Sequence, residues 1–187
     1  MIQQGSSLNK MVEEGLLFDN VVIPSDNFNF KKYRQNRIRA DGKMFTQDDA
    51  AKMLQLADAQ VISKFERNEL RPDNRTYSLF LLATDNHPFY DLENKSDELT
   101  KPEGLIIEPP TDPESIKSAR EAIAGLQQNQ ISYLLGLHLK VFGKYESSNA
   151  NPKNRRSPTA HTWTLFLLIT NQHPYYKLSP KKENTNV

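Results

Sequence analysis

Apolar residues recur at helical spacing in four segments of the first half of the chain, separated by turn residues. The first segment runs from residue 28 or 30 to about residue 40, with Phe30 and Tyr33 on one side and basic residues on the other. The second and third segments begin at Thr46 and Asp58, residue types that cap helices. The pattern therefore predicts an amphipathic helix followed by two short helices joined by a turn.

The fourth segment predicts the helix that closes this half of the chain. It begins at Thr76, and His87 and Pro88 end it. Helical spacing assigns the inward positions of the last three segments to Ala50, Ala51, Met53, Leu54, Val61, Ile62, Phe65, Leu79, Phe80, Leu82 and Ala83.

The second half of the chain repeats this pattern. Residues 162–178 match residues 76–92 at ten of seventeen positions, with a constant offset of 86. Before that match, Gln127 and Gln128 begin a helix, Gly136 marks a turn and His138 takes the cap of the next helix. The buried positions there are Ile131, Leu134, Leu135, Phe142 and Tyr145. The repeat predicts two units, at residues 12–92 and 103–178, with tails at 1–11 and 179–187 and a linker at 93–102.

A weaker similarity relates the front of each unit, residues 14–19 and 103–108. Both are short apolar runs bounded by charge, and the pattern predicts a strand-like segment before each set of helices. A lone strand of this length is not stable. We expect the two segments to pair with each other, with a helical core or across a dimer, and the sequence does not choose among these.

The charge is uneven along the chain, although the net value is only +1. Residues 30–92 have 11 Lys and Arg against 9 Asp and Glu, residues 115–178 have 8 against 2, and residues 93–114 have 2 against 7. An acidic linker between two positive segments suits contact with nucleic acid, and equally suits an ordinary solvated linker.

The composition also excludes several classes of protein. No apolar run is long enough to span a membrane, and the N-terminus lacks the pattern of a secretion signal. The absence of cysteine excludes disulfides and cysteine-ligated metal, and fits a cytoplasmic protein. There is no phosphate-binding glycine loop, nucleophile elbow or metal-ligand spacing. We therefore expect no catalysis, cofactor, metal or small-molecule ligand.

The residues between Thr46 and Pro72 resemble the Cro/phage-repressor (XRE) class of helix-turn-helix. The similarity rests on Thr46 and Gln47, on the stretch at 62–68 and on Pro72. Two departures are Asn68, where the family has glycine, and a turn one residue longer. The second unit has the turn glycine, Gly136, but carries a six-residue insertion before Pro158. Its residues 142–146 are also similar to the helix-turn-helix half of MqsA-type antitoxins.

The resemblance implies a mainly α protein of two tandem helix-turn-helix domains, each with four to five helices and a preceding strand-like segment. It implies sequence-specific binding of double-stranded DNA, with base contacts from the third helix and backbone contacts from the start of the second. The base-reading candidates are Gln60, Ser63, Lys64, Lys140, Gly143 and Lys144. The backbone and phosphate candidates are Thr46, Gln47, Arg67, Arg71, Gln127, Gln128, Lys153, Arg155 and Arg156.

Other conspicuous polar residues receive structural roles. Glu66 and Glu146 are expected to hold the core by pairing with an arginine of the first helix, with candidates Arg37, Arg39 and Arg120. His87 and His173 stand before proline at a helix end, where capping is expected rather than metal binding. Tyr77 and Trp163 occupy matching core positions, which argues against a base-stacking platform.

These inferences predict a cytoplasmic, nucleoid-associated transcriptional regulator with two unlike half-sites, for example direct repeats, and a possible homodimer. The linker of about ten residues spans up to ~35 Å when extended, which matches the ~34 Å between major grooves one turn apart. Two alternatives are an accessory DNA-binding protein of a plasmid or phage, and a protein-interaction module in which one unit no longer contacts DNA.

Overall fold

The computed structural model describes residues 29–39, 42–95, 104–148 and 156–181, and these form a mainly α protein with one small sheet. The first half forms α2 (Phe30–Asn36), α3 (Gln47–Met53), α4 (Ala59–Glu66) and α5 (Asn74–Ala83). The second half forms α6 (Pro113–Glu121), α7 (Gln128–Leu134), α8 (Val141–Tyr145) and α9 (Ala160–Ile169). Among the described residues, no helix has the length and apolar character that crossing a membrane requires.

Side chains cap most of the helices, at positions that the sequence marks. Thr46 accepts a hydrogen bond from the backbone of Asp49, whose carboxylate accepts one from the backbone of Thr46, which completes a capping box. Asp58 caps α4 and Asp73 caps α5. The expected cap at His138 is wrong, because the N-cap of α8 is Lys140, two residues later. The carbonyl of His138 instead accepts the Val141 N–H in the turn that leads into the helix.

The shared ending of the two units contains a strand that the helical pattern of residues 76–92 and 162–178 does not predict. Helix α5 ends at Ala83, and the chain reverses through Asp85 at a φ of 60° before strand β1 (Tyr90–Asn94). Asn171 has a φ of 56° at the matching place before β2 (Tyr176–Pro180). Left-handed residues of this kind stop a helix, so each repeat closes as a helix, a turn and a strand.

Strands β1 and β2 pair antiparallel in a register that relates the two halves by an approximate two-fold axis. Leu92 pairs with Leu178, its own counterpart in the repeat, while Tyr90 pairs with Pro180 and Asn94 with Tyr176. Reciprocal pairing of equivalent residues is the signature of two-fold symmetry. The sheet thus joins the halves as a dimer interface would, but within one chain.

Reciprocal lysine contacts extend this junction beyond the strands. The Lys95 ammonium donates to the carbonyl of Asn171 at 2.7 Å, and the Lys181 ammonium donates to the carbonyl of Asp85 at 3.2 Å. Each lysine therefore binds the turn after the closing helix of the opposite half. Glu93 and Asn94, which the sequence places in the linker, belong to β1 instead.

The chain after the linker lies between the halves and is not a strand. Leu105 and Ile106 are buried there. The Leu105 N–H donates to the carbonyl of Met53 in the first half at 2.9 Å, and the Ile107 N–H donates to the Thr164 hydroxyl in the second half at 2.8 Å. The strand expected over 103–108 is wrong for residues 104–108, because helix ends and side chains satisfy this backbone. The helical core is thus the partner of this segment, while residues 12–23 lie outside the described residues.

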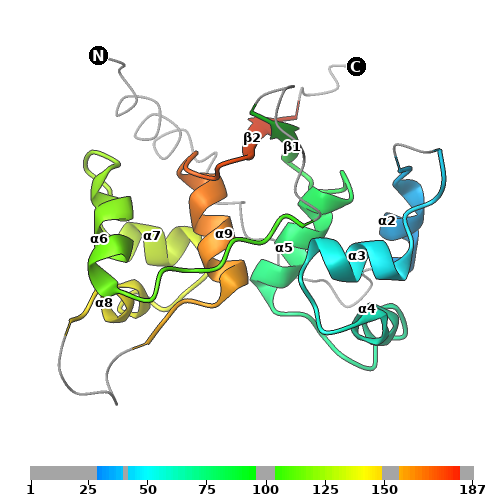
Figure 1. Ribbon diagram of the computed structural model, residues 1–187, viewed down its shortest axis with the longest axis horizontal. Helices are drawn as coiled ribbons and strands as arrows, with labels where there is room; N and C mark the ends of the chain where they lie inside the picture. Colours follow the sequence, from blue (N-terminus) through cyan, green and yellow to red (C-terminus); the bar gives the residue numbers. More distant parts are fainter. Residues whose placement is uncertain (1–28, 40–41, 96–103, 149–155, 182–187) are drawn as a thin grey trace.

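Both halves contribute to one contiguous apolar core. Phe30 and Phe80 pack with ring centroids 3.9 Å apart in the first half, and Trp163 stacks on Phe166 at 5.0 Å in the second. Figure 1 shows α5 and α9 adjacent at the centre, with α2–α4 on one side and α6–α8 on the other. The sheet lies at one end of this arrangement, and α4 and α8 lie toward the other end.

Candidate nucleic-acid interface

Helix α4 has a buried side and a polar exposed side. Ile62 and Phe65 are buried, whereas Gln60 and Lys64 are exposed and Ser63 is half-buried. This division follows from helical periodicity, because residues three or four apart, such as Ile62 and Phe65 or Gln60 and Lys64, share a face. The side chains predicted to read bases therefore include two that reach solvent.

Helix α8 presents its own exposed cations in the second half. Phe142 and Tyr145 are buried in the core, while Lys140 and Lys144 are exposed. A hollow of about 440 Å³ lies between α8 and the start of α7. Its lining consists of Arg120, Gln127, Gln128, Asn129, Leu139, Lys140 and Gly143.

Gly143 has a packing role in this structure. A Cβ atom built at Gly143 would lie 2.9 Å from the side-chain oxygen of Gln128. Glycine therefore lets α8 approach the first turn of α7 more closely than a larger residue would. Ser63 holds the corresponding position in α4, where its hydroxyl accepts a hydrogen bond from Arg67.

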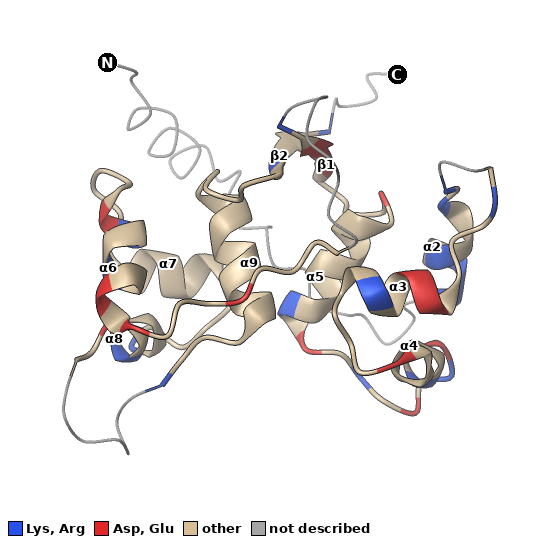
Figure 2. Ribbon diagram, viewed as in Figure 1, with Lys and Arg blue, Asp and Glu red and all other residues tan. Residues whose placement is uncertain are grey.

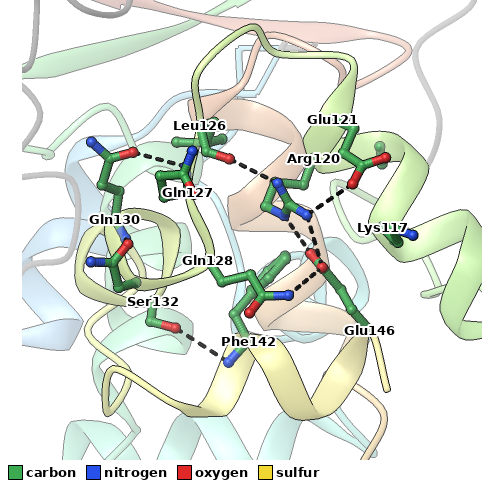
Figure 3. A network of polar contacts seen from close by, with 12 residues as sticks. Lys117, Arg120, Glu121, Leu126, Gln127, Gln128, Gln130, Ser132, Phe142 and Glu146 are labelled. Carbon is green, nitrogen blue, oxygen red and sulfur yellow. Dashed lines mark hydrogen bonds and ion pairs between the residues drawn. The ribbon is translucent and has the colours of Figure 1, made fainter. Parts of the chain in front are cut away.

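A buried polar network fixes α8 to the helices around it, as Figure 3 shows. Arg120 on α6 donates to the Glu146 carboxylate at 2.6 Å, and the Gln128 amide donates to its second oxygen at 2.7 Å. Arg120 also donates to the carbonyl of Leu126 at 2.9 Å. The hydrogen bond to Glu146 raises the pKa of Arg120. This cluster supports the expected structural role of Glu146 and the choice of Arg120 as its partner.

The first half contains the same network. The Glu66 carboxylate accepts hydrogen bonds from Arg34 at 2.6 Å and from the Gln47 amide at 2.7 Å. The arginine partner expected for Glu66 was Arg37 or Arg39, and that expectation is wrong. Arg37 instead pairs with Asp85 and Arg39 with Asp49. The repeat gave no clear signal for Arg34, because Glu66 and Glu146 are 80 positions apart whereas Arg34 and Arg120 are 86 apart.

The remaining predicted contacts fall into three groups. Gln47 and Gln128 bind the buried glutamates, and Thr46 closes the capping box of α3. Exposed side chains on the surface are Arg67, Arg71, Gln127 and Arg156. Lys153 and Arg155 lie outside the described residues. Most of the predicted residues thus lie on or next to α3 and α4 in the first half and α7 and α8 in the second, and Gln47 and Gln128 are bound to the buried glutamates.

The two proline-preceding histidines order the turns before the strands. The Nδ1 atom of His173 accepts the N–H groups of Tyr175 and Tyr176, and His87 accepts those of Phe89 and Tyr90 in the same way. Burial lowers the pKa of His173, although its hydrogen bond to the carbonyl of Leu105 opposes this effect. No cluster of potential metal ligands occurs in the described part of the chain. The imidazoles thus bind the turn that leads into each strand, while the backbone N–H groups of His87 and His173 bind carbonyls at the helix ends.

Comparison with known proteins adds no family assignment. Protein-family models, curated proteins and solved structures were all compared with the chain, and none of them matches. The resemblance to phage repressors stays a prediction that rests on the residues quoted for it.

Proposed function

We propose that this protein binds double-stranded DNA with sequence preference, as a nucleoid-associated transcriptional regulator. In this proposal α3 with α4 and α7 with α8 are two helix-turn-helix pairs, and α4 and α8 enter adjacent major grooves. The observation that carries the proposal is the placement of α4 and α8 toward the same end of one body, with exposed lysine on each.

The chemistry of the exposed side chains suits base reading. Lysine donates to the O6 and N7 acceptors of guanine, and glutamine forms two hydrogen bonds with adenine. Lys140 and Lys144 are free to approach a base edge because buried Phe142 and Tyr145 anchor their helix from behind. Gln60 and Lys64 have the same support from Ile62 and Phe65.

The approximate two-fold axis favours an inverted arrangement of the half-sites over the direct repeats considered above. A two-fold relation between reading helices is mirrored by a two-fold relation between half-sites on the duplex. The helices differ in sequence, so the half-sites differ too and the site is an imperfect inverted repeat. The paired strands and the shared core, rather than an extended linker, set the separation of the units.

Site selection from random duplexes, followed by titration with salt, tests this function. We expect an enriched site and a steep decrease in affinity as salt rises, because several phosphate contacts release counterions. If the protein retains no duplex even at ~50 mM salt, the DNA-binding function is wrong and the protein-interaction alternative replaces it.

Substitutions in the second unit test the assigned roles. Lys140→Ala or Lys144→Ala should weaken binding to the selected site by about 1–3 kcal/mol and leave random-duplex binding less affected. Arg156→Ala should weaken both alike, since phosphate contacts do not read sequence. Lys177→Ala removes the same charge from β2 and is the matched control. Equal losses on both duplexes for all variants would contradict the roles of Lys140 and Lys144.

A further inference from the structure

Equivalent contacts in the two halves show which residues of α3 correspond to which residues of α7. Gln47 and Gln128 occupy the same place, because each donates to the buried glutamate of its unit. The third positions of the two capping boxes, Asp49 and Gln130, also coincide. The position between them is Asp48 in α3 and Asn129 in α7.

This alignment shows a difference in charge at matched positions. The first turn of α3 has Asp48 and Asp49, while that of α7 has no acidic residue. Asp58 begins α4, where the α7–α8 turn has His138. Figure 2 shows acidic segments on α3 and beside α4. At these three matched positions the first unit therefore has carboxylates, and the second unit has carboxamides or imidazole.

Internal ion pairs further reduce the charge that the first unit can offer to DNA. Arg67, which follows α4, donates to the Glu69 carboxylate through two nitrogens, at 2.6 and 2.9 Å. Lys52 pairs with Asp48 at 2.9 Å, and the Asp48 side chain is 63% exposed. In the second half, Lys140 and Lys144 are exposed, and Glu146 at the end of α8 is buried against Arg120. The exposed carboxylates beside α8, Glu114 and Glu121, belong to α6 and pair with Lys117 and Arg120.

We propose that the two units contribute unequally to DNA binding. The α7–α8 surface supplies most of the affinity and specificity, while Asp48 and Glu69 limit the affinity of the α3–α4 surface. A carboxylate near a phosphate repels it, and an arginine already paired with a carboxylate neutralises less phosphate charge and so releases fewer counterions from the DNA. The half-site at α8 is therefore strictly specified, and the half-site at α4 tolerates substitutions. This inference rests on the DNA-binding function proposed above.

Removing the two carboxylates tests the inference. Asp48→Asn with Glu69→Gln keeps the size of both side chains and frees Arg67. We expect about three- to tenfold tighter binding of the selected duplex at ~150 mM salt, and a steeper salt dependence by about one phosphate contact. Asp91→Asn on β1 removes the same kind of charge away from α4, so it should change affinity less than twofold, within about 0.4 kcal/mol.

The reverse substitution, Asn129→Asp, introduces a carboxylate at the matched place on α7. It keeps the side-chain oxygen that accepts the Gln130 N–H, and we expect binding to weaken about three- to tenfold. The inference is overturned if the Asp48 and Glu69 double variant binds no more tightly than Asp91→Asn, or if Asn129→Asp binds as wild type does. If the wild-type protein binds no duplex at low salt, the proposed DNA-binding function is wrong, and this inference is wrong as well. Circular dichroism confirms that every variant keeps its helices.

Discussion

Each half of the protein contains one buried arginine–glutamate pair, which has a structural role. The side chains of Glu66 and Glu146 are 6% and 3% exposed, and each accepts hydrogen bonds from an arginine and a glutamine. Removing one partner of such a pair costs about 3–5 kcal/mol, because the other charge stays buried. The glutamates therefore hold α4 and α8 in place, while Lys64 and Lys144 on the same helices stay exposed.

At the residue scale, His173 makes the stability of the fold depend on pH. Burial holds its pKa below the ordinary value of 6.5, so the unfolded chain binds a proton at a higher pH than the folded protein does. Stability should be full above about pH 6.5 and decrease as the pH falls below that value. Thermal unfolding between pH 7.5 and 5.5, values that bracket ~6.5, measures this decrease.

His173→Asn is the comparison for this measurement. Asparagine retains an oxygen that can accept the N–H groups of Tyr175 and Tyr176 but does not titrate. We expect the variant to be less stable at neutral pH and to lose less on acidification than wild type. The same pH dependence in both proteins would show that other groups govern it.

At the scale of elements, the turn between α7 and α8 depends on one backbone conformation. Gly136 has a φ of 61°, which a residue with a side chain adopts at a cost of roughly 1–2 kcal/mol. Gly136→Ala should therefore lower the free energy of unfolding by about that amount, measured by urea titration. It should also weaken DNA binding if the angle of α8 changes with the turn.

Asn171→Gly is the control for the urea titration of Gly136→Ala, because it should leave the stability nearly unchanged. Asn171 has a φ of 56° at the end of α9, and glycine adopts this conformation without strain. The free energy of unfolding should change by less than about 0.5 kcal/mol, since asparagine tolerates the left-handed region well. A large loss at Asn171 and none at Gly136 would contradict the assignment of strain to these turns.

At the scale of the whole molecule, the two halves share one core and one sheet in spite of the repeat. Residues of both halves form the core, β1 pairs with β2, and Leu105 is fully buried between helix α3 and His173. Independent domains joined by a flexible linker would unfold in separate transitions. We instead expect a single cooperative transition.

Leu105→Ala tests this cooperativity. Loss of a fully buried leucine should lower the free energy of unfolding by about 2–5 kcal/mol, and both halves should respond together. Fluorescence of Trp163, the one tryptophan in the chain, follows the second half, while far-ultraviolet circular dichroism follows all helices. The two signals should coincide in wild type and variant. A fluorescence transition that separates from the dichroism transition would show that the halves fold independently.

Local residue patterns predict most of the helices, several of their caps and the repeat. Thr46 and Asp58 cap helices where local pattern placed them. Asn68, which stands where the resembling family has glycine, adopts the left-handed conformation at a φ of 58°. The structural role of Glu66 and Glu146 followed from the resemblance to the helix-turn-helix family. The helices and caps depend on residues within a few positions of one another, so local spacing is enough to reveal them.

Only the tertiary structure decided how the halves meet. Strands β1 and β2 pair residues more than eighty positions apart, and Leu105 finds its partners on α3 and at His173. Such contacts depend on which surfaces remain unsatisfied once the helices have formed, and no local pattern records that. For the same reason Arg34, rather than Arg37 or Arg39, is the partner of Glu66. Long-range pairing set the two-fold arrangement, and with it the relative orientation of α4 and α8.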